Sequence, residues 1–198
     1  MDIILYEFGS SRSIRCRWTF KELGIDYKSI EDRSLLRSEE FKKIHPLGKM
    51  PAAVIDGKPL FESAAICTYV ADQTKDVDLI AKPGNWGRAC HDQWVSFALT
   101  ELEAWVWSTA VNTFVLPEEQ RIPSCISQNE KMFQRGAEAV ENFLSENNFF
   151  VEDRFTVTDI IVGYTLNWGR RQGLVEDLPS INQYLERLFS RTECTLSR

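Results

Sequence analysis

Three serines and an arginine lie close together near the start of the chain, in the stretch GSSRS that contains Ser10, Ser11, Arg12 and Ser13. The residues before this stretch are strand-like and those after it have helical spacing, so the hydroxyls lie at a strand-to-helix turn. A serine in such a turn caps the helix. A hydroxyl there can also donate a hydrogen bond to an anion that the helix N-terminus attracts. The turn contains no cysteine, so disulfide exchange at this position is excluded.

A second group of charged and hydroxyl side chains lies in the stretch HPLGKMPAAVIDGKPLFES. Glu62 and Ser63 stand where a helix is predicted to begin, and taken alone they are explained by an ordinary helix cap. Helix N-termini also bind anions, and Lys49 upstream adds a point charge. The combination favours a binding site for a ligand with charged groups over a simple cap.

The elements that position these residues differ between the two halves of the chain. The first half predicts a βαβ unit, a polar helical stretch, a hairpin with the turn Asp56-Gly57, and a further helix; the segments are residues 2–8, 12–23, 25–30, 38–44, 52–61 and 62–76. After a linker, the spacing of apolar residues is helical throughout, and the predicted helices are residues 87–114, 124–146, 156–170 and 179–190. We therefore predict an α/β domain over residues 1–76, a linker over 77–86 and an all-helical domain over 87–198.

The stretch FTVTDI carries a helix-start signal in the second half. Thr156 is placed to be the N-cap, and Asp159 three residues later can reach back to the Thr156 amide. The usual residue at the third position is Glu or Gln, so Asp is a shorter variant. We interpret Thr156 and Asp159 as a structural cap.

Composition and charge exclude several classes of function. The net charge of -6, from 29 acidic and 23 basic residues without a basic block, argues against nucleic-acid binding. No apolar run is long enough for a membrane span, and the first residues lack a basic signal-peptide region, so we expect a cytoplasmic protein without a membrane partner. The five cysteines form no CxxC pair and there are two histidines, so we expect reduced thiols, no metal and no tightly bound cofactor.

Three stretches together resemble the cytosolic glutathione S-transferase superfamily: LYEFGSSRSIRCRWTFKELGIDY, PLGKMPAAVIDGKPLFESAAICTYVAD and FTVTDIIVGYTLNW. The likeness covers the whole chain, and TELEAWVWSTAVNTFVLPEEQR is similar to bacterial members. The resemblance implies a thioredoxin-like βαβ-α-ββα domain followed by an all-helical domain. It also implies a homodimer in which the thioredoxin-like domain of one chain faces the helical domain of the other.

The resemblance assigns roles in binding glutathione, an extended tripeptide with two carboxylates and an amine. It implies that Met50-Pro51 is a cis peptide, which turns the Met50 backbone toward the tripeptide for strand-like pairing. Ser63 and the adjacent helix start would hold the γ-glutamyl carboxylate, Glu62 the ammonium group and Lys49 the glycyl carboxylate.

The same resemblance makes the serine turn the thiol-activating end of the site. Alignment by the spacing to Gly24 puts Ser10 where serine-type enzymes carry their catalytic serine, with Ser11 beside it, and puts Tyr6 where other classes carry a catalytic tyrosine. We rank Ser10 first, Ser11 second and Tyr6 third. Arg12 attracts an anionic substrate or the glutathione thiolate, or is an ordinary solvent-exposed arginine.

The turn SSRSIR is similar to that of the zeta class, with both serines and Arg15 kept. Zeta enzymes carry a cysteine where this chain has Arg12, and they usually show Gln-Ser where it has Glu62 and Ser63. These two departures argue against maleylacetoacetate isomerase activity, which stays an alternative.

The acceptor substrate is less defined by the sequence. Trp105 and Trp107 lie in the predicted helix that lines the acceptor pocket in the family, although aromatic residues in a long helix are more often core. We predict His45 to be a surface loop residue. The resemblance thus implies an enzyme that activates the thiol of glutathione, its co-substrate, for attack on small hydrophobic electrophiles. The alternatives are an isomerase, a glutathione peroxidase or a non-catalytic binding protein.

Overall fold

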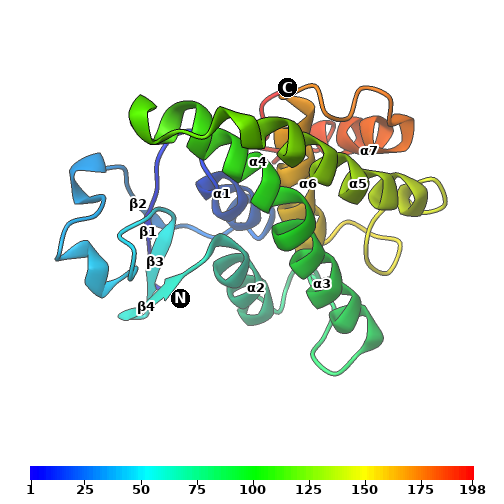
Figure 1. The fold of residues 1–198 in the computed structure, drawn as a ribbon. Helices are drawn as coiled ribbons and strands as arrows, with labels where there is room; N and C mark the ends of the chain where they lie inside the picture. The colour runs from blue at the N-terminus through cyan, green and yellow to red at the C-terminus, as the bar shows by residue number, and fades with distance from the viewer.

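The computed structural model describes all of residues 1–198 and places a four-stranded sheet with its helices beside a bundle of longer helices (Figure 1). The sheet contains four short strands in the order β2-β1-β3-β4. Their bounds are β1 (Ile3–Tyr6), β2 (Lys28–Ile30), β3 (Ala52–Ile55) and β4 (Lys58–Phe61). Strand β2 is parallel to β1 and the other pairs are antiparallel. A parallel pair requires a crossover connection, and helix α1 (Ser13–Glu22) supplies it, which confirms the predicted βαβ unit.

The β3–β4 hairpin has the turn that the sequence predicts. Asp56 and Gly57 both have positive φ, 48° and 78°, as a two-residue hairpin turn of the favoured twist requires. Aspartate and glycine reach this region of backbone conformation at little cost. The turn therefore fixes the register in which Ala52 pairs with Phe61.

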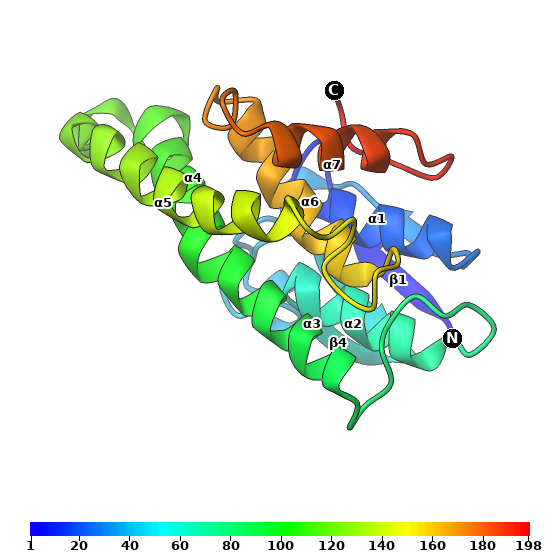
Figure 2. The ribbon, with the colours of Figure 1, turned by 90° about the vertical axis from the view of Figure 1, so that its right-hand side faces the viewer.

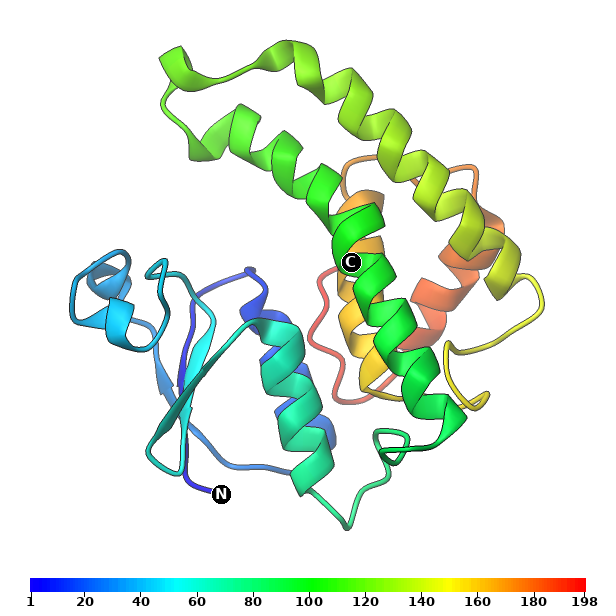
Figure 3. The same ribbon diagram turned by 60° about the horizontal axis from the view of Figure 1, so that its bottom comes forward.

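Helices α1 and α2 (Ser63–Gln73) cover the face of the sheet that is turned toward the helical bundle (Figure 3). Ile3 and Leu5 of β1 are buried in the main core, whereas Tyr6 packs in a smaller cluster around Phe41, with ring centroids 5.1 Å apart. The alternation of side chains along a strand places these two sets on opposite faces.

The prediction of a polar helix over residues 38–44 is wrong. The segment between β2 and β3 instead contains two short 3₁₀ turns, Arg33–Leu35 and Phe41–Lys43. Phe41 is the only side chain in the second turn that is buried. A single anchor does not provide the apolar stripe that a longer helix needs to pack against the sheet.

The second half of the chain is helical, as predicted, and its helices are α3 (Trp86–Phe97), α4 (Ala104–Ala110), α5 (Ile126–Leu144), α6 (Val157–Arg170) and α7 (Pro179–Phe189). Two π-helical segments, Ala98–Glu103 and Val111–Val115, flank α4. The predicted helix over residues 87–114 is therefore one continuous helical path, along which the hydrogen-bonding pattern alternates between α and π. Two 3₁₀ turns, Glu118–Gln120 and Pro123–Cys125, connect this long helical path to α5.

Helix α6 joins the two halves, because it packs on α1 and α2 on one side and on α3 and α7 on the other (Figure 2). One core cluster of 35 buried residues runs through both halves, and α6 contributes Ile160, Ile161 and Leu166 to it. The segment between α2 and α3 adds Leu79, whose carbonyl accepts a hydrogen bond from the Val157 amide at 2.8 Å. The two halves thus share one hydrophobic core, which holds their relative position.

The predicted structural cap is present at the start of α6. An oxygen of Asp159 accepts hydrogen bonds from the Thr156 amide at 2.8 Å and from the Thr156 hydroxyl at 3.1 Å. The other carboxylate oxygen accepts from the Phe150 amide at 3.2 Å and the Tyr184 hydroxyl at 3.0 Å. Asp159 is completely buried, so the short variant of the cap also ties α6 to α7 and to the preceding loop.

All five cysteines are free, and no group of three or more His, Cys, Asp or Glu side chains is placed to hold a metal ion. None of the helices combines the length and the apolar character needed to span a membrane.

Candidate active site

The serine turn between β1 and α1 contains two hydroxyls that are bonded to the turn itself. The Ser11 hydroxyl donates to the Phe8 carbonyl at 2.7 Å and accepts from the Ser13 amide at 3.2 Å. The Ser13 hydroxyl is buried, lies 2.9 Å from that of Ser11 and accepts weakly from the Phe8 amide at 3.4 Å. These bonds close the turn and satisfy the amide of Ser13, the first residue of α1.

Ser10 differs from its neighbours in this turn. It is exposed, and its hydroxyl makes no hydrogen bond within the protein. Its proton is therefore free to be donated to an anion at the start of α1, where the helix dipole favours negative charge. Of the three serines, Ser10 alone combines exposure with an unused hydroxyl.

Tyr6 lies at the end of β1 in the cluster of Phe41 and Met50, on the sheet face away from α1 and α2. Its side chain is half-buried and its hydroxyl has no partner within the protein. The ring is therefore used for packing, and a catalytic role of Tyr6 stays the third-ranked prediction.

The segment from Lys49 to Ser63 has the backbone geometry that the resemblance implies. The Met50-Pro51 peptide is cis. Helix α2 begins at Ser63, which is 3% exposed, and the exposed Glu62 before it has a φ of 71°, in a region that residues with a side chain rarely occupy. Backbone strain of this kind gathers at ligand sites, because the surrounding structure must hold it in place.

A buried ionic network joins α1 to the helical domain. The Arg15 side chain is completely buried, and its guanidinium forms an ion pair with Glu103, from the π-helical segment before α4. It also donates to the Ile161 carbonyl at 3.1 Å and the Thr165 hydroxyl at 2.6 Å, both in α6. Thr165 in turn donates to Glu103 at 3.0 Å.

The same network includes Ser63, a residue of the predicted binding site for the γ-glutamyl carboxylate. The Arg15 guanidinium donates to the Ser63 hydroxyl oxygen at 3.2 Å. Arginine has no acceptor, so the Ser63 proton is left free to be donated elsewhere, as binding a ligand carboxylate requires. Arg15 thus positions Ser63.

Glu103 is shared between two arginines. One oxygen pairs with Arg15 and the other with the Arg12 Nε. Burial alone would raise the pKa of Glu103, but the charges of Arg15 and Arg12 outweigh it and hold that pKa at about 2. Glu103 is therefore ionised at neutral pH, and the three groups together carry one net positive charge.

Glu103 and Thr165 were not predicted from the sequence, and Arg15 was noted only because the turn SSRSIR is similar to that of the zeta class. The available signal was a glutamate at a core-facing position beside Leu102 and Val106, where a charged residue needs a buried partner. The partner lies 88 residues away along the chain, so periodicity could not name it.

Arg12 lies against the aromatic side chains of the helical domain. Its guanidinium carbon is 4.6 Å from the ring centroid of Trp107 and 5.4 Å from that of Trp168. The Lys49 ammonium lies 5.8 Å from the centroid of the same Trp107. The structure therefore brings together the serine turn, the Lys49 segment and Trp107, whereas Trp105 packs against the main core and is not among these contacts.

His45 is buried, so the prediction of a surface loop residue is wrong. Its Nδ1 accepts a hydrogen bond from the Leu47 amide at 3.1 Å, and its ring lies 5.1 Å from that of Phe61. Burial lowers the pKa of His45 from its ordinary value. The ring therefore supports the loop that precedes Lys49.

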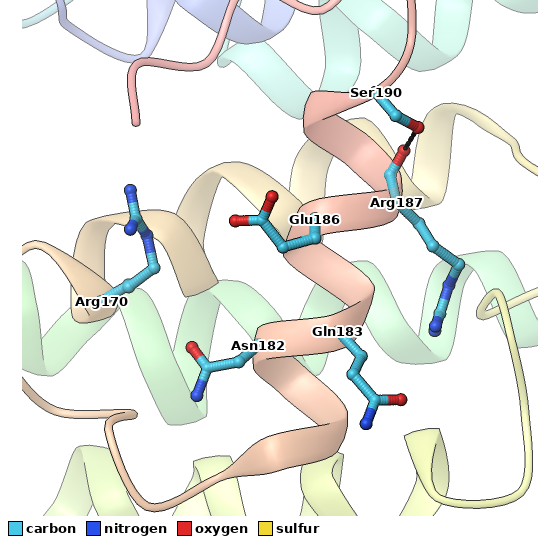
Figure 4. A pocket seen from close by; sticks show the side chains of 6 residues that line it. All are labelled: Arg170, Asn182, Gln183, Glu186, Arg187 and Ser190. Carbon is cyan, nitrogen blue, oxygen red and sulfur yellow. Dashed lines mark hydrogen bonds between the residues drawn. The ribbon is translucent and has the colours of Figure 1, made fainter.

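A surface depression elsewhere is lined only by polar side chains of α6, α7 and the residue after α7 (Figure 4). The lining residues are Arg170, Asn182, Gln183, Glu186, Arg187 and Ser190. Arg170 and Arg187 lie on opposite sides of α7 in this view. None of the six is a predicted site residue, and the depression has no part in the site described above.

Comparison with known proteins identifies the class to which this fold and site belong. Residues 1–72 match the family model "Glutathione S-transferase, N-terminal domain" and residues 102–192 match "Glutathione S-transferase, C-terminal domain". The chain belongs to the glutathione S-transferase superfamily, and the predicted fold class is confirmed.

Among curated relatives, Glutathione S-transferase GstA of Escherichia coli O157:H7 is 28% identical over 187 residues, which is 91% of this chain and 90% of that protein. Probable elongation factor 1-gamma 2 of Arabidopsis thaliana is 30% identical over 159 residues, 77% of this chain but only 36% of that protein. The crystal structure of glutathione transferase URE2P6 from Phanerochaete chrysosporium, in complex with oxidized glutathione, has a TM-score of 0.85 and 24% identity. The match covers 98% of this chain and 93% of that one.

Proposed function

We propose that the chain transfers glutathione to small hydrophobic electrophiles and that the Ser10 hydroxyl activates the thiol. The observation that carries the assignment is the contrast within the serine turn. Ser11 and Ser13 are bonded to the turn, whereas Ser10 is exposed with an unused proton. The glutathione S-transferase relative from Escherichia coli and the fungal structure with oxidized glutathione support the transferase activity.

The chemistry needs a stabilised thiolate beside an electrophile. A free cysteine thiol has a pKa of about 8.5, and each unit by which a site lowers it corresponds to about 1.4 kcal/mol of stabilisation of the anion. The Ser10 hydroxyl and the start of α1 supply this stabilisation by hydrogen bonding and by the helix dipole. The thiol proton is lost to solvent, and the sulfur forms a bond to an electrophilic carbon. Either a leaving group departs from that carbon with its bonding pair, or the π bond of a conjugated double bond breaks and its other end takes a proton from solvent.

The rest of the site holds the tripeptide. Ser63, oriented by Arg15, and the first amides of α2 take the γ-glutamyl carboxylate, and Glu62 takes the ammonium group. Lys49 takes the glycyl carboxylate, and the Met50 backbone pairs with the cysteinyl residue. Arg12 is near the thiol but extends toward the helical domain.

A binding module without turnover is the competing candidate, and the similarity to elongation factor 1-gamma proteins favours it. An isomerase or a peroxidase would use the same glutathione site. The exposed Ser10 hydroxyl supports an enzyme, because a binding module has no need of a thiol-activating group.

The family resemblance supports a homodimer, and β4 and α2 carry large exposed side chains, Phe61 and Tyr69, that a second copy would cover. A mass of two chains in light scattering would support it, and a single-chain mass would contradict it.

The five free cysteines suit a reducing compartment, so we place the protein in the cytoplasm.

The transferase assignment is tested by conjugation of glutathione to 1-chloro-2,4-dinitrobenzene. We expect turnover by the wild type and a loss of about 10- to 100-fold in kcat/KM for Ser10→Ala, the usual range for a hydrogen bond to a charged group. Ser11→Ala should mainly lower the free energy of unfolding, by about 1 kcal/mol, because it removes the hydrogen bonds to the Phe8 carbonyl and the Ser13 amide. Binding of glutathione without turnover of this substrate, cumene hydroperoxide or maleylacetone would instead support the binding module.

A further inference from the structure

The Arg12 guanidinium has one nitrogen that is hydrogen-bonded within the protein and two that are not. Its Nε donates to Glu103, whereas its two terminal nitrogens have no hydrogen-bond partner within the protein. The side chain is 28% exposed, so these donors are open to solvent. Two parallel N–H groups in a fixed plane match the geometry of a carboxylate.

Three contacts hold this guanidinium in place before any ligand arrives. Glu103 fixes its Nε, and the rings of Trp107 and Trp168 lie 4.6 and 5.4 Å from its carbon. Trp107 and Trp168 are themselves in edge contact, with centroids 6.5 Å apart. A guanidinium held in this way loses little conformational freedom on binding an anion.

The charge of Glu103 does not cancel that of Arg12. Glu103 is shared with the completely buried Arg15, so two cations face one anion. Arg15 uses its donors on Ser63, Ile161 and Thr165. The surplus positive charge is therefore presented at the exposed end of Arg12.

Lys49 is the other cation beside Trp107, at 5.8 Å from its ring centroid. In the proposed function, the Lys49 ammonium binds the glycyl carboxylate of glutathione and is no longer available to a second anion. Arg12 then remains as the cation next to Trp107, two residues from Ser10. An acceptor molecule at the thiol meets an aromatic ring and a free guanidinium side by side.

We propose that the acceptor substrates of this protein are flat aromatic or conjugated electrophiles that carry a carboxylate, with Trp107 contacting the ring and Arg12 binding the carboxylate. The inference rests on the proposed transferase function and narrows its substrate class. It assigns Arg12 to the acceptor and not to glutathione, since the side chain extends toward α4 and α6.

The test compares two electrophiles that differ only in the carboxylate: 1-chloro-2,6-dinitrobenzene and 4-chloro-3,5-dinitrobenzoate. In both, the thiolate forms a carbon–sulfur bond at the ring carbon that bears chlorine, and chloride leaves. For each substrate, kcat/KM is divided by the rate constant of the uncatalysed reaction with glutathione. The ratio of the two quotients measures the preference for the carboxylate and cancels any effect on thiol activation.

We expect a ratio of about 10 or more for the wild type, the preference that a charge-assisted contact of modest strength supplies. Arg12→Gln should bring it to about 1, and Arg12→Lys, which keeps the charge but not the planar fork, should give an intermediate value. Lys58→Gln, which removes an exposed positive charge on the β4 hairpin, is the charge-matched control and should keep the wild-type ratio. Lys49→Gln should raise the KM for glutathione and keep the ratio.

A wild-type ratio near 1 would overturn the proposal, and so would a ratio that survives in Arg12→Gln or is lost only in Lys49→Gln. These outcomes differ from failure of the proposed function, in which neither substrate is conjugated. A shift in the pKa of bound glutathione in Arg12→Gln without a change in the ratio would assign Arg12 to the thiolate and would also overturn the proposal.

Discussion

Side chains of the candidate site are held by partners that lie far away in the chain. Arg15 positions Ser63 by a hydrogen bond at 3.2 Å, and Glu103 holds both Arg15 and Arg12. An ion pair as deeply buried as this one is weak evidence for stability by itself, because desolvation offsets the attraction between the charges. Breaking it is costly, however, since the remaining charge stays buried without a partner.

Replacing Glu103 by Gln should lower the free energy of unfolding by about 3 to 5 kcal/mol at pH 7, because Arg15 loses its counter-ion. The pKa of Glu103 is depressed to about 2 in the folded protein, below its usual value of 4.5. The pair therefore stabilises the wild type above pH 4.5, and this contribution is lost as the pH falls from about 4.5 toward 2. Urea unfolding at several pH values should show the two proteins converging in acid, and a constant difference between them down to pH 2 would contradict the assignment.

At the scale of elements, helix α6 depends on a cap that does more than start a helix. Asp159 accepts from the Thr156 amide, the Phe150 amide and the Tyr184 hydroxyl, and it is fully buried. Helix α6 is itself buried along almost its whole length between the two halves. The cap consequently fixes the start of the one element on which both halves pack.

Thr156→Ala should cost about 1 to 2 kcal/mol of unfolding free energy, the range for loss of a helix cap. Asp159→Ala should cost more, about 3 kcal/mol or above, because it leaves several buried donors without an acceptor. Tyr184→Phe removes one of these donors and should cost about 1 kcal/mol, which makes it the matched control. Chemical denaturation of the three variants gives the order, and an equal cost for Thr156→Ala and Asp159→Ala would show that the carboxylate serves only the cap.

At the scale of the whole molecule, the parts that the sequence predicts are those with local causes. The Asp56-Gly57 turn, the βαβ unit and the cap at Thr156 each depend on residues close together in the chain. The π-helical segments and the short turns of residues 33–43 do not follow from periodicity, because tertiary packing decides them.

The candidate site, like the fold, could be predicted from the sequence only where its residues lie close together in the chain. Ser10 and Ser63 lie in linear stretches and could be named, whereas the link from Ser63 through Arg15 to Glu103 needs the fold. The burial of His45 likewise depends on Phe61, which reaches it from β4. The sequence thus predicts candidate ligand-binding groups, and the structure adds the groups that hold them.

In the proposed function, the hydroxyl of Ser10 stabilises the thiolate of bound glutathione. Ultraviolet difference spectroscopy across a pH range measures the pKa of the bound thiol in the wild type, Ser10→Ala, Ser11→Ala and Tyr6→Phe. We expect a pKa below the free value of about 8.5 in the wild type and a rise of about one unit or more, equivalent to about 1.4 kcal/mol, in Ser10→Ala alone. A rise in Ser11→Ala or Tyr6→Phe with no change in Ser10→Ala would contradict this role of Ser10.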